Sequence, residues 1–355
     1  MSLLQATLNN IGELDRGAME RARARVDSLL KPPGSLGRLE ELAVHLAGIT
    51  GRAFPEIKAK TVIVMAGDHG VVAEEVSAAP QEITWQILPR FLDGTGGIGV
   101  LARHVGAKVV VVDIGVARPV ELPGVVIRKI RHGTGNIAHG PAMMREEAVR
   151  AVEVGIELAQ TEIQHGADLI ATGDMGIGNT TPSSAILCAL AGVPVKEAVG
   201  RGTMVNDTIL ERKRRVVARA LQVNRPDRSD PLDVVAKVGG LEIAGLAGVI
   251  LGAAARRVPV LLDGFITGAA ALVAAGLCPA VRNFMIASHL SEERAHRTML
   301  AALGLKPLLD FNLRLGEGTG AALAIPVVEA AAKILKEMAT FKDAGVSEME
   351  RDRLL

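Results

Sequence analysis

The chain has 355 residues, 49% of them hydrophobic, which is enough to bury one large core or two smaller ones. Only 2% are aromatic, there is no Tyr and the net charge is +1, which excludes the aromatic and basic surfaces typical of nucleic-acid binding. The N-terminus has no signal-peptide pattern and no apolar run reaches the roughly 20 residues of a membrane span. We therefore expect a cytoplasmic protein without nucleic-acid or membrane partners.

Residues 1 to about 50 are predicted to form helices, with a break at 31–37. From Lys60 onward the pattern changes to short β-branched runs separated by helical stretches, which predicts a mostly parallel sheet with helices on both faces. The predicted strands are 61–65, 108–112, 168–171, 259–262 and 283–287.

No strand is expected after about residue 300, so the sequence predicts two domains. The larger is an α/β domain over 56–300 that carries a phosphate site. The smaller is helical and consists of 1–55 together with 301–355, the segment that carries Glu317.

Polar residues and glycines follow directly after the predicted strands. In a parallel sheet the carboxyl ends of the strands lie at one edge, where α/β proteins bind ligands. The sequence therefore predicts one polar site at this edge, built by the segments 67–70, 113–115, 173–176, 263–264 and 288–289.

The segment 171–184 predicts a phosphate site. A strand runs into a glycine loop, and two threonines then cap a helix with a proline in its first turn. Backbone N–H groups and the helix dipole at such an N-terminus favour an anion. Gly173 and Gly178 have the spacing of a P-loop, but Asn179 stands where that motif has lysine, which favours a monophosphate over a triphosphate.

Two other glycine turns are interpreted differently. The turn at 200–203 is expected to add backbone donors to the phosphate site, while Arg201 is either a cation for the phosphate or a solvated turn residue. The G-x-G-x-x-G sequence at 94–99 matches the dinucleotide fingerprint, but a helix rather than a strand is predicted before it. We interpret it as a helix-to-helix turn and expect no NAD.

Glu317 is the candidate catalytic residue. It lies in the sequence Gly-Glu-Gly-Thr-Gly, directly before the apolar stretch 321–338, a predicted buried helix. Glycines let the backbone approach a ligand closely, and an apolar surface raises the pKa of a carboxyl group, as a general base requires. The alternative is a carboxylate that only stabilises a helix start, which would not explain the three glycines.

Neither metal nor disulfide chemistry is predicted. Cys188 and Cys278 lie in apolar surroundings without C-x-x-C spacing, and we expect them to be small buried side chains. Hydrogen-bonded roles, rather than zinc ligation, are expected for the loop histidines, which are His69, His132, His139 and His289. No acidic pair precedes a Gly/Thr turn, so phosphoribosyl diphosphate is not the expected donor.

Six motifs in order resemble the nicotinate-nucleotide:dimethylbenzimidazole phosphoribosyltransferase family over residues 30 to 335. They are Lys-Pro-Pro-Gly-Ser-Leu-Gly-Arg-Leu-Glu at 31–40, Ala-Gly-Asp-His-Gly-Val at 66–71, Gly-Asp-Met-Gly-Ile-Gly-Asn-Thr-Thr-Pro at 173–182, Lys-Val-Gly-Gly at 237–240, Val-Leu-Leu-Asp-Gly-Phe at 260–265 and Arg-Leu-Gly-Glu-Gly-Thr-Gly-Ala-Ala-Leu-Ala at 314–324.

The resemblance implies a pentosyltransferase of cobalamin biosynthesis. It would move the 5-phosphoribosyl group from nicotinate mononucleotide to 5,6-dimethylbenzimidazole, giving α-ribazole 5′-phosphate and nicotinate. It also implies a homodimer with a Rossmann-like large domain. No metal or cofactor is implied, because the pyridinium of the donor is already a good leaving group.

By the same resemblance, Glu317 would be the general base that removes the benzimidazole proton. The acceptor nitrogen would then attack the anomeric carbon opposite nicotinate and invert β to α. The resemblance also implies residues that hold the ribose and phosphate, that lie near these groups or that form an apolar wall. They are Asp174, Gly176, Asn179, Thr180, Gly202, Thr203, Lys213 and Leu315.

Two residues depart from the family pattern. Asp174 stands where the motif has Glu, and Ala79 stands where a Ser-Pro pair is expected in the base pocket. The acceptor therefore stays open between 5,6-dimethylbenzimidazole and another benzimidazole, a purine or a phenol. A non-catalytic nucleotide-binding protein is the alternative from another class, although such a protein would not require Glu317.

Overall fold

Contacts within the computed structural model, which describes residues 1–202 and 205–347, divide the chain into two compact units. The larger consists of Met1–Gly12 and Ala59–Ala324, and the smaller of Glu13–Lys58 and Ile325–Leu355. This division places Glu317 in the larger unit, whereas the sequence-based boundary at 300 placed it with the smaller one. The apolar pattern of α15 (Thr319–Glu337) continues through the boundary at Ala324, so nothing in the sequence marks a boundary between units there.

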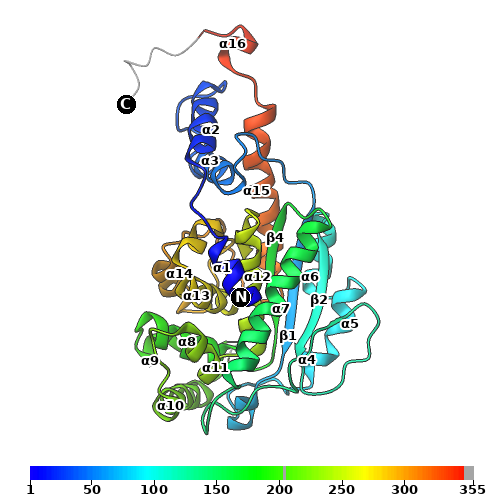
Figure 1. The fold of residues 1–355 in the computed structure, drawn as a ribbon, viewed down its shortest axis with the longest axis vertical. Helices are drawn as coiled ribbons and strands as arrows, with labels where there is room; N and C mark the ends of the chain where they lie inside the picture. The colour runs from blue at the N-terminus through cyan, green and yellow to red at the C-terminus, as the bar shows by residue number, and fades with distance from the viewer. Residues whose placement is uncertain (203–204, 348–355) are drawn as a thin grey trace. The chain divides into compact units, whose positions relative to one another are not determined.

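The larger unit is built on a six-stranded sheet in the order β3-β2-β1-β4-β5-β6, and every pairing is parallel. Figure 1 labels its central strands β4, β1 and β2. The strands are β1 (Lys60–Gly67), β2 (Lys108–Gly115), β3 (Val126–Ile127), β4 (Leu169–Met175), β5 (Val260–Leu262) and β6 (Met285–Ala287). The predicted parallel sheet is confirmed, and only the two-residue β3 was missed, because it is too short to give a pattern. This strand order is that of Rossmann folds, and its ligand crevice lies where the order reverses, between β1 and β4.

Helices cover both faces of this sheet. Met65 of β1 lies against Gly245 of α12, whereas Val62 of the same strand lies against Gly318, at the start of α15. Since side chains alternate along a strand, these two residues point to opposite faces. The helices of the larger unit are α1 (Leu3–Asn9), η1 (Gly70–Glu74), α4 (Ile83–Gln86), α5 (Leu88–Leu92), α6 (Gly97–His104), α7 (Arg145–Gln164), α8 (Thr180–Ala191), α9 (Val195–Ala198), α10 (Asp207–Asn224), α11 (Pro231–Val238), α12 (Leu241–Ala255), α13 (Phe265–Leu277), η2 (Pro279–Phe284) and α14 (His296–Leu303).

The smaller unit is helical, as predicted. It contains α2 (Arg16–Ser28), α3 (Arg38–Thr50), the second part of α15 and α16 (Phe341–Ala344). The loop between α2 and α3 is held by a buried ion pair between Lys31 and Glu40, with 2.8 Å between Nζ and Oε1. Glu40 also accepts the Leu36 N–H, so this sequence motif has a structural role in its own unit.

The predicted burial of the two cysteines is only partial. Cys188 and Cys278 are free, as predicted, but both are half-buried, because they lie at the ends of α8 and α13 rather than within the core. Burial still raises the pKa of Cys188 to about 12, which disfavours its thiolate. Over residues 1–202 and 205–347, no helix is long and apolar enough to cross a membrane.

Candidate active site

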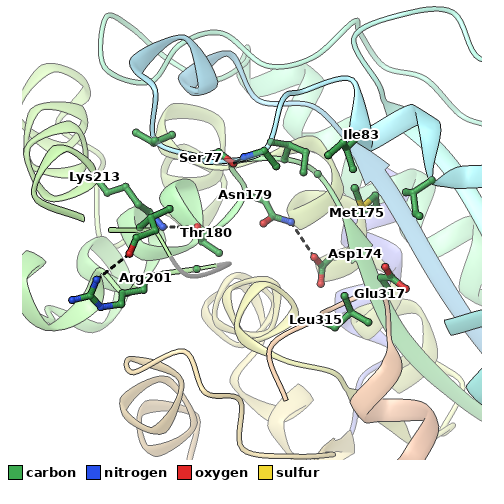
Figure 2. A pocket seen from close by; sticks show the side chains of 18 residues that line it. Ser77, Ile83, Asp174, Met175, Asn179, Thr180, Arg201, Lys213, Leu315 and Glu317 are labelled. Atoms are coloured by element: carbon green, nitrogen blue, oxygen red, sulfur yellow. Dashed lines mark hydrogen bonds between the residues drawn. The ribbon is translucent and has the colours of Figure 1, made fainter. Parts of the chain in front are cut away.

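A cavity of about 290 Å³ lies beyond the carboxyl end of β4 (Figure 2). The predicted site residues that line it are Asp174, Gly176, Asn179, Thr180, Gly202, Lys213, Leu315 and Glu317. Thr203, the remaining one, lies outside the described residues. Figure 2 shows that basic and acidic side chains lie at opposite ends of the cavity, with Lys213 and Arg201 at one end and Asp174 and Glu317 at the other.

The cationic end is formed by the first turn of α8 and by Lys213 of α10. The Lys213 side chain is only 1% exposed, and its Nζ donates to Thr180 Oγ1 at 2.8 Å. Burial lowers the pKa of Lys213, although the charge of Glu293 opposes this effect. A buried ammonium beside a helix N-terminus is a suitable site for one phosphate group.

The predicted threonine cap of α8 is wrong in detail. The helix begins at Thr180, so Asn179 precedes it, and the Asn179 side chain makes no cap bond. Its Nδ2 instead donates to Asp174 Oδ2 at 2.9 Å, which fixes the carboxyl group at the end of β4. Burial, with the charges of Asp263 and Glu242, raises the pKa of Asp174 well above its usual range.

Arg201 is paired within its own segment. Its guanidinium donates to the carboxylate of Asp207 and, at 2.9 Å, to the carbonyl of Val205. The side chain nevertheless lines the cavity, so its two expected roles are both compatible with its position.

Three consecutive left-handed residues form the backbone turn at Glu317. The φ angles of Gly316, Glu317 and Gly318 are 83°, 65° and 92°. A non-glycine residue rarely adopts this region, so Glu317 is held there at a cost of about 1–3 kcal/mol. The turn is also close to β4, because a Cβ at Gly173 would lie 2.5 Å from the Glu317 carbonyl oxygen.

The Glu317 carboxylate is 8% exposed and contacts a helix that the sequence did not connect with it. Its Oε2 accepts the backbone N–H of Ile98 at 3.2 Å, at the N-terminus of α6. Burial raises the pKa of Glu317, as predicted, while the bond from Ile98 partly opposes the rise. The 94–99 turn is confirmed as a helix-to-helix connection, between α5 and α6.

Asp263, directly after β5, anchors the residues that follow Glu317. Its Oδ2 accepts the Gly318 N–H and its Oδ1 accepts the Ala321 N–H, both at 3.0 Å. Burial raises the pKa of Asp263 to about 7, against the opposing effect of these backbone donors. The sequence placed Asp263 at the ligand edge of the sheet but did not indicate this anchoring role.

A buried His69–Glu242 pair lies beneath the glycine loop after β4. His69 Nε2 and Glu242 Oε1 are 2.9 Å apart, and a Cβ at Gly176 would lie 3.2 Å from that nitrogen. Burial lowers the pKa of His69, but the Glu242 carboxylate outweighs it and the net shift is upward. Among the described residues, no three His, Cys, Asp or Glu side chains gather into a possible metal site.

An apolar wall completes the cavity. Ala79 and Leu315 were identified from the sequence, and the other apolar members, which were missed, include Val76, Ile83, Ile87, Met175 and Ile177. Ile83 and Ile87 are four residues apart around the short helix α4, a spacing that could have revealed them. Beside them, Ser77 Oγ accepts the Ala79 N–H at 3.1 Å.

The fold and the cavity are those of an α/β enzyme that acts on a phosphorylated small molecule. Residues 11–346 match the family DBI_PRT, described as Phosphoribosyltransferase. The chain is 57% identical over 349 residues to the nicotinate-nucleotide–dimethylbenzimidazole phosphoribosyltransferase of Desulforamulus reducens, covering 98% of this chain and 99% of the relative. The Chloroflexus aggregans protein of the same name is 58% identical, with the same coverage.

Solved structures agree with these sequence matches. The structure of CobT from Thermus thermophilus superposes with a TM-score of 0.91 at 50% identity, covering 94% of this chain and 100% of the other. A second structure from that organism, of the nicotinate-nucleotide–dimethylbenzimidazole phosphoribosyltransferase, has a TM-score of 0.90 at 49% identity, covering 95% of this chain and 100% of the other. The chain belongs to the nicotinate-nucleotide–dimethylbenzimidazole phosphoribosyltransferase family.

Proposed function

We propose that the protein transfers the 5-phosphoribosyl group of nicotinate mononucleotide to 5,6-dimethylbenzimidazole. The products are α-ribazole 5′-phosphate, for the lower nucleotide loop of cobalamin, and nicotinate. The observation that carries this proposal is the pairing, in one cavity, of a cationic end at Lys213 with a buried carboxylate at Glu317. The family membership supports the same substrates.

The donor phosphate would bind at the cationic end. Lys213 and Thr180 already share a hydrogen bond there, and the first turn of α8 supplies backbone N–H groups. Gly176, Asn179 and the turn with Gly202 and Thr203 would hold the ribose. Asp174, held at the end of β4 by Asn179, would form a hydrogen bond with the ribose.

The acceptor would lie against the apolar wall, with its N–H directed at Glu317. One ring nitrogen attacks the anomeric carbon with its lone pair, and the bond from that carbon to the nicotinate nitrogen breaks. The electron pair of this bond neutralises the pyridinium, and the proton on the other ring nitrogen passes to the Glu317 carboxylate. Attack opposite the leaving group inverts the β-linkage to α.

The test is the release of nicotinate from nicotinate mononucleotide by the purified protein, with and without 5,6-dimethylbenzimidazole, in EDTA. We expect release only with the acceptor, and we expect EDTA to leave the rate unchanged. Donor binding without release in the presence of any benzimidazole would favour a non-catalytic nucleotide-binding protein.

The preferred acceptor is tested by a panel of benzimidazoles, purines and phenols. Ala79 contributes no side-chain hydrogen bond to the apolar wall, so we expect 5,6-dimethylbenzimidazole to react faster than adenine, whose polar edge would remain unpaired.

From the resemblance we also propose a cytoplasmic homodimer without nucleic-acid or membrane partners. Light scattering during size-exclusion chromatography measures its mass.

A further inference from the structure

Glu293 is a buried carboxylate outside the proposed reaction. It lies in the segment after β6, is 8% exposed, and its Oε2 has no hydrogen-bond partner among the described residues. The local backbone holds it firmly. Its N–H donates to Ser291 Oγ at 3.3 Å, and its carbonyl accepts the His296 N–H at 2.8 Å.

The carboxylate faces the glycine turn that borders the donor end of the cavity. The Gly202 N–H donates to it, and a Cβ at Gly200 would lie only 2.1 Å from Oε2. Glycine at position 200 thus lets the carboxylate pack directly against the turn. At the same turn, a Cβ at Gly202 would lie 3.3 Å from Lys213 Nζ.

Lys213 and Glu293 therefore both lie against one short backbone turn. Each is buried, and each shifts the pKa of the other toward the charged form. Lys213 without such a neighbour would lose its proton more easily, because burial disfavours the ammonium. A neutral Lys213 would still donate a hydrogen bond but would not neutralise a phosphate.

We infer that Glu293 is a positioning residue of the donor site, which holds Lys213 as a cation next to the Gly200–Gly202 turn. This inference rests on the proposed role of Lys213 in binding the donor phosphate. It adds a residue that touches neither substrate and acts only through Lys213.

Other charges near Lys213 are paired or exposed. Among the elements in contact with α10, α8 carries no Asp, Glu, Lys or Arg, and α9 carries only the exposed Lys196 and Glu197. On α11, Lys237 pairs with Asp233 at 2.9 Å. Three further pairs near Lys213 are Arg201 with Asp207, Arg214 with Glu211 and Arg212 with Glu75. On α10 itself, Arg215 and Arg219 are exposed.

The experiment measures the dissociation constant of nicotinate mononucleotide by calorimetry from pH 6 to pH 10, for wild type and Glu293→Gln. Gln keeps the size and an acceptor for the Gly202 N–H but removes the charge. We expect binding about tenfold weaker, on the scale of one charge-assisted hydrogen bond. We also expect affinity to be lost at a lower pH than in wild type, because Lys213 deprotonates more easily. The exposed neighbour Glu292→Gln is the matched control and should bind as wild type does.

Two further variants separate this role from a general structural one. In a Lys213→Met background, Glu293→Gln should cause no additional loss of affinity, since the group through which it acts is gone. Gly200→Ala keeps every charge but displaces the Glu293 carboxylate, and should weaken binding as Glu293→Gln does. It also serves as the test if Glu293→Gln fails to fold.

Wild-type affinity and pH dependence in folded Glu293→Gln, or wild-type affinity in folded Gly200→Ala, would overturn the inference. Calorimetry needs no turnover, so the inference and the proposed function can fail separately. A shifted pH dependence in a protein that never releases nicotinate would support Glu293 as a positioning residue while contradicting the proposed transfer.

Discussion

The carboxylate of Glu317 rests on the N-terminus of α6, where Oε2 accepts the backbone N–H of Ile98 at 3.2 Å. The positive end of the helix dipole favours the ionised carboxylate, whereas burial opposes it and prevails. The group is thereby fixed in position and made more basic than an ordinary glutamate. A general base that works near neutral pH requires both properties.

Gly97→Ala should displace this carboxylate without removing it. A Cβ at Gly97 would lie 2.9 Å from Glu317 Oε2 and 2.8 Å from Leu315 Cδ2. Misplacement of a catalytic group by about 1 Å can cost about 100-fold in rate, so we expect kcat to fall by about 10- to 100-fold. Gly140→Ala, where a Cβ meets nothing within 4 Å, is the matched control. Equal kcat values for the two variants would show that a side chain at position 97 does not displace the Glu317 carboxylate.

Glu317→Gly should make the protein more stable and inactive. Glycine adopts the φ of 65° without strain, and the change also removes a buried carboxylate. We expect the free energy of unfolding in urea to rise by about 1 kcal/mol at pH 7. Asn312→Gly, also at a left-handed residue but an exposed one, should gain less. A less stable Glu317→Gly would contradict this expectation and show that the lost bond from the Ile98 N–H outweighs the relief of strain.

Asp263→Asn should loosen the anchor behind Glu317. Asparagine offers one carbonyl oxygen, so it cannot accept both the Gly318 and the Ala321 N–H as the carboxylate does. We expect kcat to fall by about tenfold, with a smaller effect on donor affinity. Steady-state kinetics with varied nicotinate mononucleotide separate the two, and an unchanged kcat would argue against this anchor.

The same variant should change how stability depends on pH. The pKa of Asp263 is raised by burial to about 7 in the folded protein, above its unfolded value of about 4. Its contribution to stability is therefore complete below pH 4 and is lost as the pH rises to about 7, by about 1 kcal/mol per pH unit. Urea unfolding at pH 5, 6 and 7 should show this decline in wild type relative to Asp263→Asn. Parallel curves would contradict the assignment.

Much of the sheet could be predicted because continuous apolar strands have a strong local pattern. The strand ends then indicated where polar residues meet, since parallel strands share a carboxyl edge. The second boundary between the units, at Ala324, could not be predicted, because α15 continues through it without a break in pattern. The short β3 had no recognisable signal, since two residues have no periodicity.

The site was only partly accessible from the sequence. Glu317 and the loop at Asp174 carry local glycine patterns, which reveal a functional turn without knowledge of the fold. Ile98, Asp263 and Glu293 act through contacts with residues far along the chain, at backbone N–H groups or next to a turn. Such contacts have no characteristic spacing along the chain. The sequence placed Asp263 at the ligand edge of the sheet, but only the three-dimensional structure shows what it anchors and connects Ile98 and Glu293 to the site.

The role of Glu317 as general base is tested most directly by comparing Glu317→Gln with wild type, both in donor binding and in turnover. We expect a dissociation constant for nicotinate mononucleotide within about threefold of wild type, because Gln keeps the size and can still accept the Ile98 N–H. We expect acceptor-dependent nicotinate release to fall by about 100- to 10,000-fold, the usual contribution of a general base. Turnover close to wild type in Glu317→Gln would contradict the central claim that this carboxylate removes the acceptor proton.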